Sequence, residues 1–238
     1  MRQTVWRTLV ILACVVSVHC GGGSDSTGTA PSQTTGSTGG SGGTSGGGSG
    51  GGSDTFRVTL PISDSFFDDG VWDDVVEAYS ANGGGSGGHL TFNGQEGAGY
   101  RQVSIHIDSG SNPQLAVFAI RRDVVYFPST DGAILWIDYS ESSINQAGGA
   151  QYSAPALRQN GKLYTLVPGG GAFTTPDASW TDHSLTHLTQ SDFRTIASAT
   201  DHPDFSTGRI EVGFMRLQAG LGATKGGIDN YRMVLYRK

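Results

Sequence analysis

Short runs in which every second residue is apolar recur from Asp54 to the end of the chain, and this pattern restricts the fold more than any other feature. The clearest runs are Phe56, Val58, Leu60; Val103, Ile105, Ile107; and Ile210, Val212, Phe214. Because successive side chains of a β-strand point to opposite faces, such a run is typical of a strand with one buried face. Residues 54–238 are therefore predicted to form an all-β domain.

Turn residues between the runs support the same prediction. Asn160 and Gly161 separate two apolar runs, and this pair favours a two-residue hairpin turn in which both positions have positive φ. One short helix is predicted where Thr189 is a candidate cap and Asp192 follows three residues later. The segment 72–79 fits either an amphipathic helix or a strand with a bulge.

About ten to twelve short strands, with few helices and no internal repeat, predict a two-sheet β-sandwich of the jelly-roll type, with a barrel as the alternative. The order of the strands does not follow from the sequence. A domain of about 185 residues can bury a core without disulfides, and both cysteines of the chain, Cys14 and Cys20, precede it.

The N-terminus has the pattern of an export signal. Arg2 and Arg7 supply positive charge, and an apolar run of about ten residues follows over 9–18. A membrane-spanning helix needs about twenty residues, whereas a run of this length is typical of a signal peptide. Residues 1–20 are therefore predicted to be a signal peptide.

Cys20, at the end of this segment, resembles the cysteine of a bacterial lipoprotein signal, which is lipidated and becomes the first mature residue. That pattern has a small residue before the cysteine, where this chain has His19. Cys14, which follows Ala13, is an alternative lipidation site, and secretion with a free cysteine is a third interpretation. The lipoprotein interpretation predicts a membrane partner through the lipid anchor and a location at the outer membrane or cell surface. The third interpretation predicts a secreted protein.

Residues 21–53 contain only Gly, Ser, Thr, Ala, Pro, Gln and one Asp. No side chain there can bury enough apolar surface to offset the entropy lost on ordering, so the segment is predicted to be a disordered linker. A Gly/Ser chain of this length has a root-mean-square span of roughly 30 Å, which is enough to hold a domain away from a lipid surface.

Several phrases of the domain occur in an order that is similar to a known class. They are Gly87-Gly88-His89-Leu90, Asp131-Gly132-Ala133-Ile134, Ile137-Asp138-Tyr139-Ser140, Gln159-Asn160-Gly161-Lys162, Ser179-Trp180-Thr181, Leu188-Thr189-Gln190, His202-Pro203-Asp204-Phe205 and Gly227-Ile228-Asp229-Asn230-Tyr231. Over residues 60–236 the set resembles an uncharacterised class of bacterial secreted domains with a concanavalin A/laminin G-like jelly roll. The last phrase is also similar to the final strand of several carbohydrate-binding modules. The resemblance implies a fold and a surface location but no reaction, since this fold hosts lectins, adhesion modules and hydrolases.

A glycoside hydrolase would need two carboxylates with separate roles. Jelly-roll glucanases place theirs on one strand as Glu-x-Asp-x-Glu or Glu-x-Asp-x-x-Glu, and the nearest counterpart here has Trp136 in place of the first glutamate, followed by Asp138 and Glu141. One carboxylate cannot serve as both acid and nucleophile, so the chain is not expected to be an enzyme. The alternative is that Trp136 packs and Asp138 makes a structural hydrogen bond.

Two further motifs lack the context that their chemistry requires. Ser86 has the spacing of a nucleophile elbow, but no strand–turn–helix pattern surrounds it, so a glycine-rich loop is predicted. His183 and His187 have the spacing of zinc ligands on a helix, but no glutamate follows His183. The segment reads as a strand or loop, which would separate the two rings.

Acidic residues cluster near the start of the domain, and calcium prefers six to eight oxygen ligands. In similar carbohydrate-binding jelly rolls a structural calcium joins the first strand to the last. That resemblance implies a site formed by Asp229 with Asp64 or Asp68. The alternative is that these acids cap solvated turns. Apart from this calcium, no cofactor is expected.

A sugar site combines an exposed aromatic face with a few polar groups. Tyr126 and Tyr139 are the candidate aromatic residues, with Arg121 and Arg122 as polar neighbours, while most aromatics of the domain are expected in the core. The favoured hypothesis is a surface-anchored, non-catalytic module that binds carbohydrate or glycoprotein. The alternatives are a structural or adhesion protein that binds another protein, and then a glycoside hydrolase. With a net charge of −6 and no basic patch, nucleic acid is not an expected partner.

Overall fold

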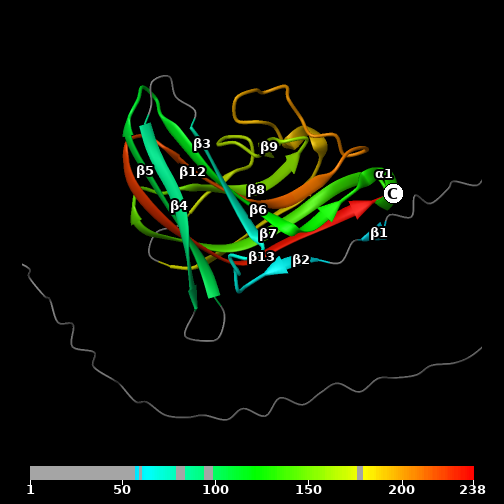
Figure 1. The fold of residues 1–238 in the computed structure, drawn as a ribbon, viewed down its shortest axis with the longest axis horizontal. Coiled ribbons are helices and arrows are strands. Elements are labelled where there is room, and N and C mark those ends of the chain that lie inside the picture. The colour runs from blue at the N-terminus through cyan, green and yellow to red at the C-terminus, as the bar shows by residue number, and fades with distance from the viewer. Residues whose placement is uncertain (1–56, 59–60, 79–83, 94–98, 176–178) are drawn as a thin grey trace, which may run out of the picture. The chain divides into compact units, whose positions relative to one another are not determined.

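The structure is a computed structural model that describes residues 57–58, 61–78, 84–93, 99–175 and 179–238 (Figure 1). The signal peptide, the linker, Cys14 and Cys20 lie outside these residues, so the predictions about export and lipidation stay predictions. Over the described part of the chain, no helix has both the length and the apolar character needed to cross a membrane.

Thirteen strands among the described residues pair into two antiparallel sheets. The first sheet contains β1 (Arg57–Val58), β2 (Ile62–Asp64), β4 (Gly84–Asn93), β5 (Gly99–Ser109), β7 (Ile134–Gly148), β11 (Thr181–Leu188) and β13 (Gly222–Arg237). The second contains β3 (Trp72–Ala78), β6 (Gln114–Tyr126), β8 (Tyr152–Gln159), β9 (Lys162–Thr165), β10 (Phe173–Thr174) and β12 (Ile210–Ala219). The helices are α1 (Pro128–Asp131) and the 3-10 helix η1 (Gln190–Asp192). The predicted all-β, two-sheet sandwich with short helices is confirmed.

β13 is the central strand of the first sheet, whose order is β11-β7-β13-β5-β4. β1 and β2 also pair with β13, so the start of the domain lies beside its end, as Figure 1 shows for β2 in cyan and β13 in red. The second sheet has the order β10-β8-β12-β6-β3, with β9 paired to β8.

The local predictions about turns and caps are also confirmed. Asn160 and Gly161 join β8 to β9 with φ values of 53° and 77°, as a two-residue hairpin turn requires. Thr189 and Asp192 form a capping box at η1. The ambiguous segment 72–79 contains strand β3, which pairs with β6 along its whole length.

An aromatic cluster fills the space between the two sheets. The ring of Trp72 lies 5.6 Å from that of Phe67, 5.4 Å from that of Phe214 and 5.3 Å from that of Tyr231, measured between centroids. All four side chains are buried. Each aromatic pair contributes about 0.5–1.5 kcal/mol beyond the burial of its area. The cluster therefore ties β3 and β12 of the second sheet to β13 of the first.

The two sheets differ in what they present on the side away from this core. On the second sheet Met215 lies opposite Phe118, and both are fully buried although they point away from the inner face that carries Phe214. On the first sheet the corresponding positions of β13 include Lys225 and Arg232, which are exposed. The outer face of the first sheet is therefore the sheet surface that is free to meet a partner.

The glycine-rich segment 84–88 belongs to strand β4, so the prediction of a loop there is wrong. A Cβ atom on Gly87 would lie 2.5 Å from Cγ2 of Val117 and 3.1 Å from Cδ2 of Leu115. Glycine therefore allows β4 to approach β6 of the opposite sheet closely, and this packing outweighs the low strand preference of glycine. The neighbouring Gly88 has nothing within 4 Å of its Cβ position.

Replacing Gly87 by alanine should lower the free energy of unfolding by about 1–3 kcal/mol, because the added methyl group overpacks a filled core. Gly88→Ala is the matched control, and its effect should stay within about 0.5 kcal/mol. Urea unfolding followed by tryptophan fluorescence measures both. Equal midpoints for the two variants would contradict the close approach of β4 to β6.

Candidate functional site

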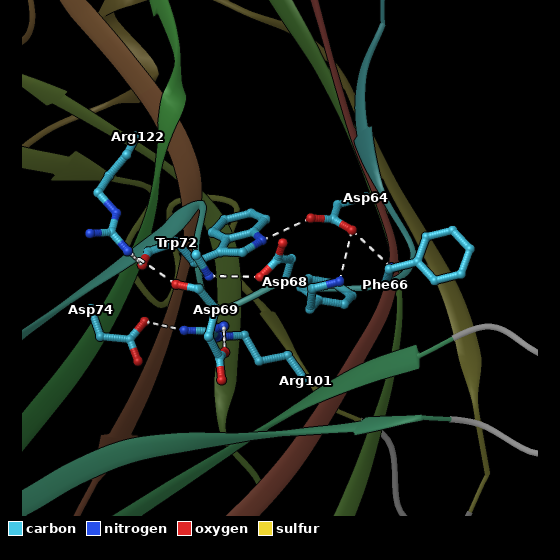
Figure 2. Close-up of polar contacts among 10 residues, drawn as sticks. Asp64, Phe66, Asp68, Asp69, Trp72, Asp74, Arg101 and Arg122 are labelled. Carbon is cyan, nitrogen blue, oxygen red and sulfur yellow. Dashed lines mark hydrogen bonds and ion pairs between the residues drawn. The ribbon is translucent and has the colours of Figure 1, made fainter.

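The acidic segment at the start of the domain forms a hydrogen-bonded turn (Figure 2). Oδ1 of Asp64 accepts the backbone N–H groups of Phe66 and Phe67, each at 2.8 Å. Oδ2 of Asp64 accepts the indole N–H of Trp72, also at 2.8 Å. Figure 2 shows the ring of Phe66 pointing away from this cluster. The Asp64 carboxylate thus fixes the turn and orients a core indole.

Two arginines hold the rest of this segment in place. Arg101 is fully buried and pairs with Asp74 at 2.7 Å and with Asp69 at 3.1 Å (Figure 2). Arg122 donates to the backbone carbonyls of Asp69 at 3.0 Å and Trp72 at 2.9 Å. The predicted ligand-binding residue Arg122 therefore anchors β3 and the turn before it.

The structure brings together two of the three predicted calcium ligands. β2 pairs with β13, and burial, followed by the charge of Asp64, raises the pKa of Asp229. Asp68 instead accepts the backbone N–H of Gly70 at 2.8 Å. Within the described ranges, no group of three His, Cys, Asp or Glu side chains is placed to hold a metal ion. The calcium site stays a prediction, and both oxygens of Asp64 already accept hydrogen bonds from the protein.

The other predicted ligand-binding residues take part in packing. Tyr126 is 8% exposed, and its hydroxyl donates to a backbone carbonyl. Tyr139 is 2% exposed, and its hydroxyl donates to Glu141. Arg121 pairs with Asp123 at 2.5 Å and donates to a backbone carbonyl of β2 at 3.1 Å. These side chains do not come together in one surface site.

The side chain of Glu141 lies between the sheets, although the residue also lines a cavity at the outer face of the first sheet. It accepts the hydroxyl of Ser153 at 2.8 Å and pairs with Arg216 at 3.1 Å, and the side chains of both members of the ion pair are fully buried. Burial and the adjacent Glu141 raise the pKa of Tyr139 well above its usual value. The Glu141 carboxylate therefore belongs to a buried ion pair in the core.

The two histidines with zinc-like spacing have separate surroundings. The ring of His183 stacks on Phe173 at 4.1 Å, while that of His187 stacks on Trp136 at 5.3 Å. Asp138 accepts the backbone N–H of His187 at 2.8 Å, which is the structural role expected for this acid.

A β-bulge in β13 shapes the outer face of the first sheet. Ile228 and Tyr231 both point inward and are fully buried although they are three residues apart. The pairing register with β7 shifts between Asp229 and Arg232, and Asn230 between them has a φ of 50°. An extra residue of this kind changes which side chains face each side. It places Asn230 and Arg232 on the outer face.

A polar cleft lies at this bulge. Two cavities of about 450 and 410 Å³ adjoin there, and both are lined by Asn230 and Arg232. The amide of Asn230 donates to the hydroxyl of Ser142 at 3.1 Å, and this hydroxyl donates to Asp182. At one end the cleft is lined by Phe66, which is 65% exposed. The cleft thus offers fixed amide, hydroxyl and carboxylate groups beside an exposed guanidinium.

An exposed indole lies further along β13. A Cβ atom on Gly227 would come within 2.8 Å of Cη2 of Trp180 and 2.9 Å of Cγ2 of Ile144. The missing side chain therefore makes room for the indole against the sheet. The ring of Tyr100 meets it edge-on at 5.4 Å, and Trp180 remains 43% exposed.

A third depression, called the hollow below, lies on the other side of Trp180 from the cleft. It is a cavity of about 320 Å³ lined by Ser104 and His106 of β5 and by Lys225 of β13. Along β13 the outer face therefore presents a hollow at Lys225, an indole at Gly227 and the polar cleft at Asn230.

A second aromatic group on this face consists of Trp136, Tyr236 and His187, whose rings stack on one another. Trp136 stacks between Tyr236 at 4.8 Å and His187 at 5.3 Å, with interplanar angles of 20° and 23°. Since both faces of its ring are covered, Trp136 packs as the sequence analysis allowed. Trp180 is the aromatic residue better placed to contact a ligand.

Sequence reasoning did not select Trp180, Asn230 or Arg232. A signal for the cleft was present, because Ile228 and Tyr231 are both strongly apolar but have odd spacing, which a regular strand cannot place on one face. No comparable signal exists for Trp180. It contacts Gly227 of β13, which is distant from it in the sequence.

The described residues define a two-sheet β-sandwich with one exposed face that carries polar and aromatic groups. No family model and no curated protein matches the chain. Among solved structures, the chain is similar to a family 11 carbohydrate-binding module from Clostridium thermocellum in complex with a β-1,3-1,4-mixed-linked tetrasaccharide. The identity is 14%, the match covers 75% of this chain and 94% of the other, and the TM-score is 0.42.

Two other similar structures are also described as carbohydrate-binding modules. The mannan-recognising module TmCBM27 is 13% identical over 77% of this chain and 99% of its own, with a TM-score of 0.39. The CBM22-1 xylan-binding domain from Paenibacillus barcinonensis Xyn10C is 12% identical over 74% and 94%, with a TM-score of 0.38. At these values the likeness carries no argument about what this chain binds.

Replacing Asp64 by alanine should destabilise the domain by about 2–4 kcal/mol, because it leaves the buried indole N–H of Trp72 and two turn amides without an acceptor. Asp68→Ala removes one acceptor from an exposed turn and should cost less than about 1 kcal/mol. Urea unfolding compares the two variants. A cost for Asp64→Ala no larger than that of Asp68→Ala would contradict the role given to Asp64.

Replacing Asp229 by asparagine should stabilise the protein near neutral pH. The pKa of Asp229 is raised above its ordinary value of 3.8, so the folded state binds the proton more tightly and loses stability as the pH rises through the folded pKa. Asparagine removes this cost and can still accept the N–H of Asn230. The gain should stay below about 1 kcal/mol because water screens a partly exposed charge.

This gain should shrink towards pH ~3, below the ordinary pKa, where both side chains are neutral. Urea unfolding of both proteins at the two pH values measures it. A gain that is unchanged at low pH would contradict the electrostatic explanation.

Proposed function

We propose that this protein is a non-catalytic binding module that recognises carbohydrate, free or on a glycoprotein, through the outer face of its first sheet. The predicted lipid anchor at Cys20 and the linker would hold the module at the cell surface. That part of the proposal rests on the sequence.

The observation that carries the proposal is the position of Trp180. Its indole lies on the sheet at Gly227 while 43% of the residue stays exposed. A rigid apolar ring with polar groups beside it matches a sugar, which has an apolar ring face edged by hydroxyl groups. Two glutamines flank the site, and Gln102 donates a side-chain hydrogen bond to Gln146.

The buried position of Glu141 favours a binding function over hydrolysis. The hydrolase hypothesis depended on Glu141, which is buried and paired with Arg216. Glycoside hydrolysis needs two carboxylates on either side of the scissile bond. An acid enclosed between the sheets cannot take either position.

The proposal predicts that at least one neutral polysaccharide retards the protein in affinity gel electrophoresis. Mixed-linkage β-glucan, xylan, mannan and galactan are the test polymers. Trp180→Ala should weaken the retained interaction at least about tenfold, since a central aromatic anchor contributes most of the binding energy.

Phe127→Ala is the matched control, because Phe127 is 45% exposed but lies outside the first sheet. It should bind as the unchanged protein does. Thermal unfolding of both variants checks that they are folded. If no polymer retards the protein while a surface protein co-purifies with it, the adhesion hypothesis replaces this one.

A further inference from the structure

The hollow, the indole and the cleft follow a single strand. Lys225, Gly227 and Arg232 all lie on the outer side of β13, and each marks one of these features. From Lys225 to Arg232 the strand advances roughly 20 Å, given about 3.3 Å per residue and one bulge. The ligand contacts available on this face are therefore arranged in a line.

We propose that the module binds the interior of a polysaccharide chain lengthwise along β13, an inference that rests on the proposed function. One sugar stacks on Trp180, and the sugars on either side contact Lys225 in the hollow and Arg232 in the cleft.

The chemistry of the two end features fits this arrangement. The exposed side chains of Lys225 and Arg232 can donate hydrogen bonds to sugar oxygens. In the cleft, the chain of hydrogen bonds from Asn230 through Ser142 to Asp182 holds acceptor and donor groups in position before a ligand arrives. Such preorganisation reduces the entropy lost on binding.

Both end features are open depressions rather than enclosed cavities. A chain can therefore continue past either end, which favours the interior of a polymer over a terminal sugar. Affinity should then increase with the number of sugars until the chain spans all three features.

A competing orientation crosses the strands instead. The two cavities of the cleft meet at Asn230, and together they extend from Phe66 beside β2 to Ser184 on β11. A chain in that direction would contact Phe66 and would not reach Lys225. These two side chains therefore distinguish the orientations.

The experiment starts from the polymer that retards the protein. The ligands are the disaccharide, tetrasaccharide and hexasaccharide prepared from that polymer. Isothermal titration calorimetry measures the affinity of each oligosaccharide for the unchanged protein and for the variants Lys225→Ala, Arg232→Ala and Phe66→Ala. All three residues are exposed, and thermal unfolding confirms that each variant is folded.

Lengthwise binding predicts that Lys225→Ala and Arg232→Ala each lower the affinity for the hexasaccharide roughly fivefold, which corresponds to the loss of one ordinary hydrogen bond. The same substitutions should leave the disaccharide within about twofold, since it reaches only the indole. Phe66→Ala should change neither ligand.

If Phe66→Ala lowers the affinity for the hexasaccharide and Lys225→Ala does not, the lengthwise arrangement is overturned while the proposed function stands. Equal affinity for the disaccharide and the hexasaccharide would also overturn it. Failure of every polymer to bind would reject the proposed function and this inference together.

Gly227→Ala tests the indole without removing it. The added methyl group would lie 2.8 Å from the ring of Trp180, so the ring must move off the sheet. Binding of both oligosaccharides should fall together and by the same factor. An unchanged affinity in a folded variant would show that the indole at Gly227 is not the central contact.

Discussion

The backbone pairing of β13 with β7 determines the exposed face. β13 pairs with β7 along most of its length and, on its other side, with β5, β2 and β1 in turn. This register sets Gly227 opposite Ile144 and Arg232 opposite Ser140. Since β13 is the last strand and its partners come from throughout the domain, the face consists of residues that are distant in the sequence. It can form only when the long-range contacts of the fold are complete, and closing such contacts carries a large entropy cost.

The alternation of hydrophobic residues was sufficient to predict the fold class because it follows burial in most strands, although Val58 of β1 is 52% exposed. Val103, Ile105 and Ile107 are buried on one face of β5, as their spacing required. Local chemistry was equally informative at Asn160 and Gly161, where the turn depends on two adjacent residues. The glycine-rich strand β4 could not be predicted in this way. Gly87 is suited to a strand only because Val117 and Leu115 of another sheet lie against it, and that proximity is a property of the assembled sandwich.

The site was less predictable than the fold, for a related reason. Residue type and spacing favour Tyr126 and Tyr139 as ligand contacts, but each hydroxyl has a partner in the protein, and both rings are buried. An aromatic residue that packs and one that binds have the same local sequence signature. What distinguishes Trp180 is the missing side chain at Gly227 of β13, and the strand order β11-β7-β13 is needed to know that the two residues are in contact.

The position of each residue within its strand finally decides its chemical role. On β7, Tyr139 and Glu141 point inward, while Ser140 and Ser142 point to the cleft. A shift of one residue would exchange these sets, burying hydroxyls and exposing the acid on which a hydrolase hypothesis depends. Inside, Glu141 is balanced by Arg216, and removing either partner of such a pair leaves an uncompensated buried charge. The register that encloses this acid is thus the same register that presents a polar surface outside. The bulge at Asn230 extends this arrangement to β13, because it places Tyr231 in the core and Arg232 on the surface.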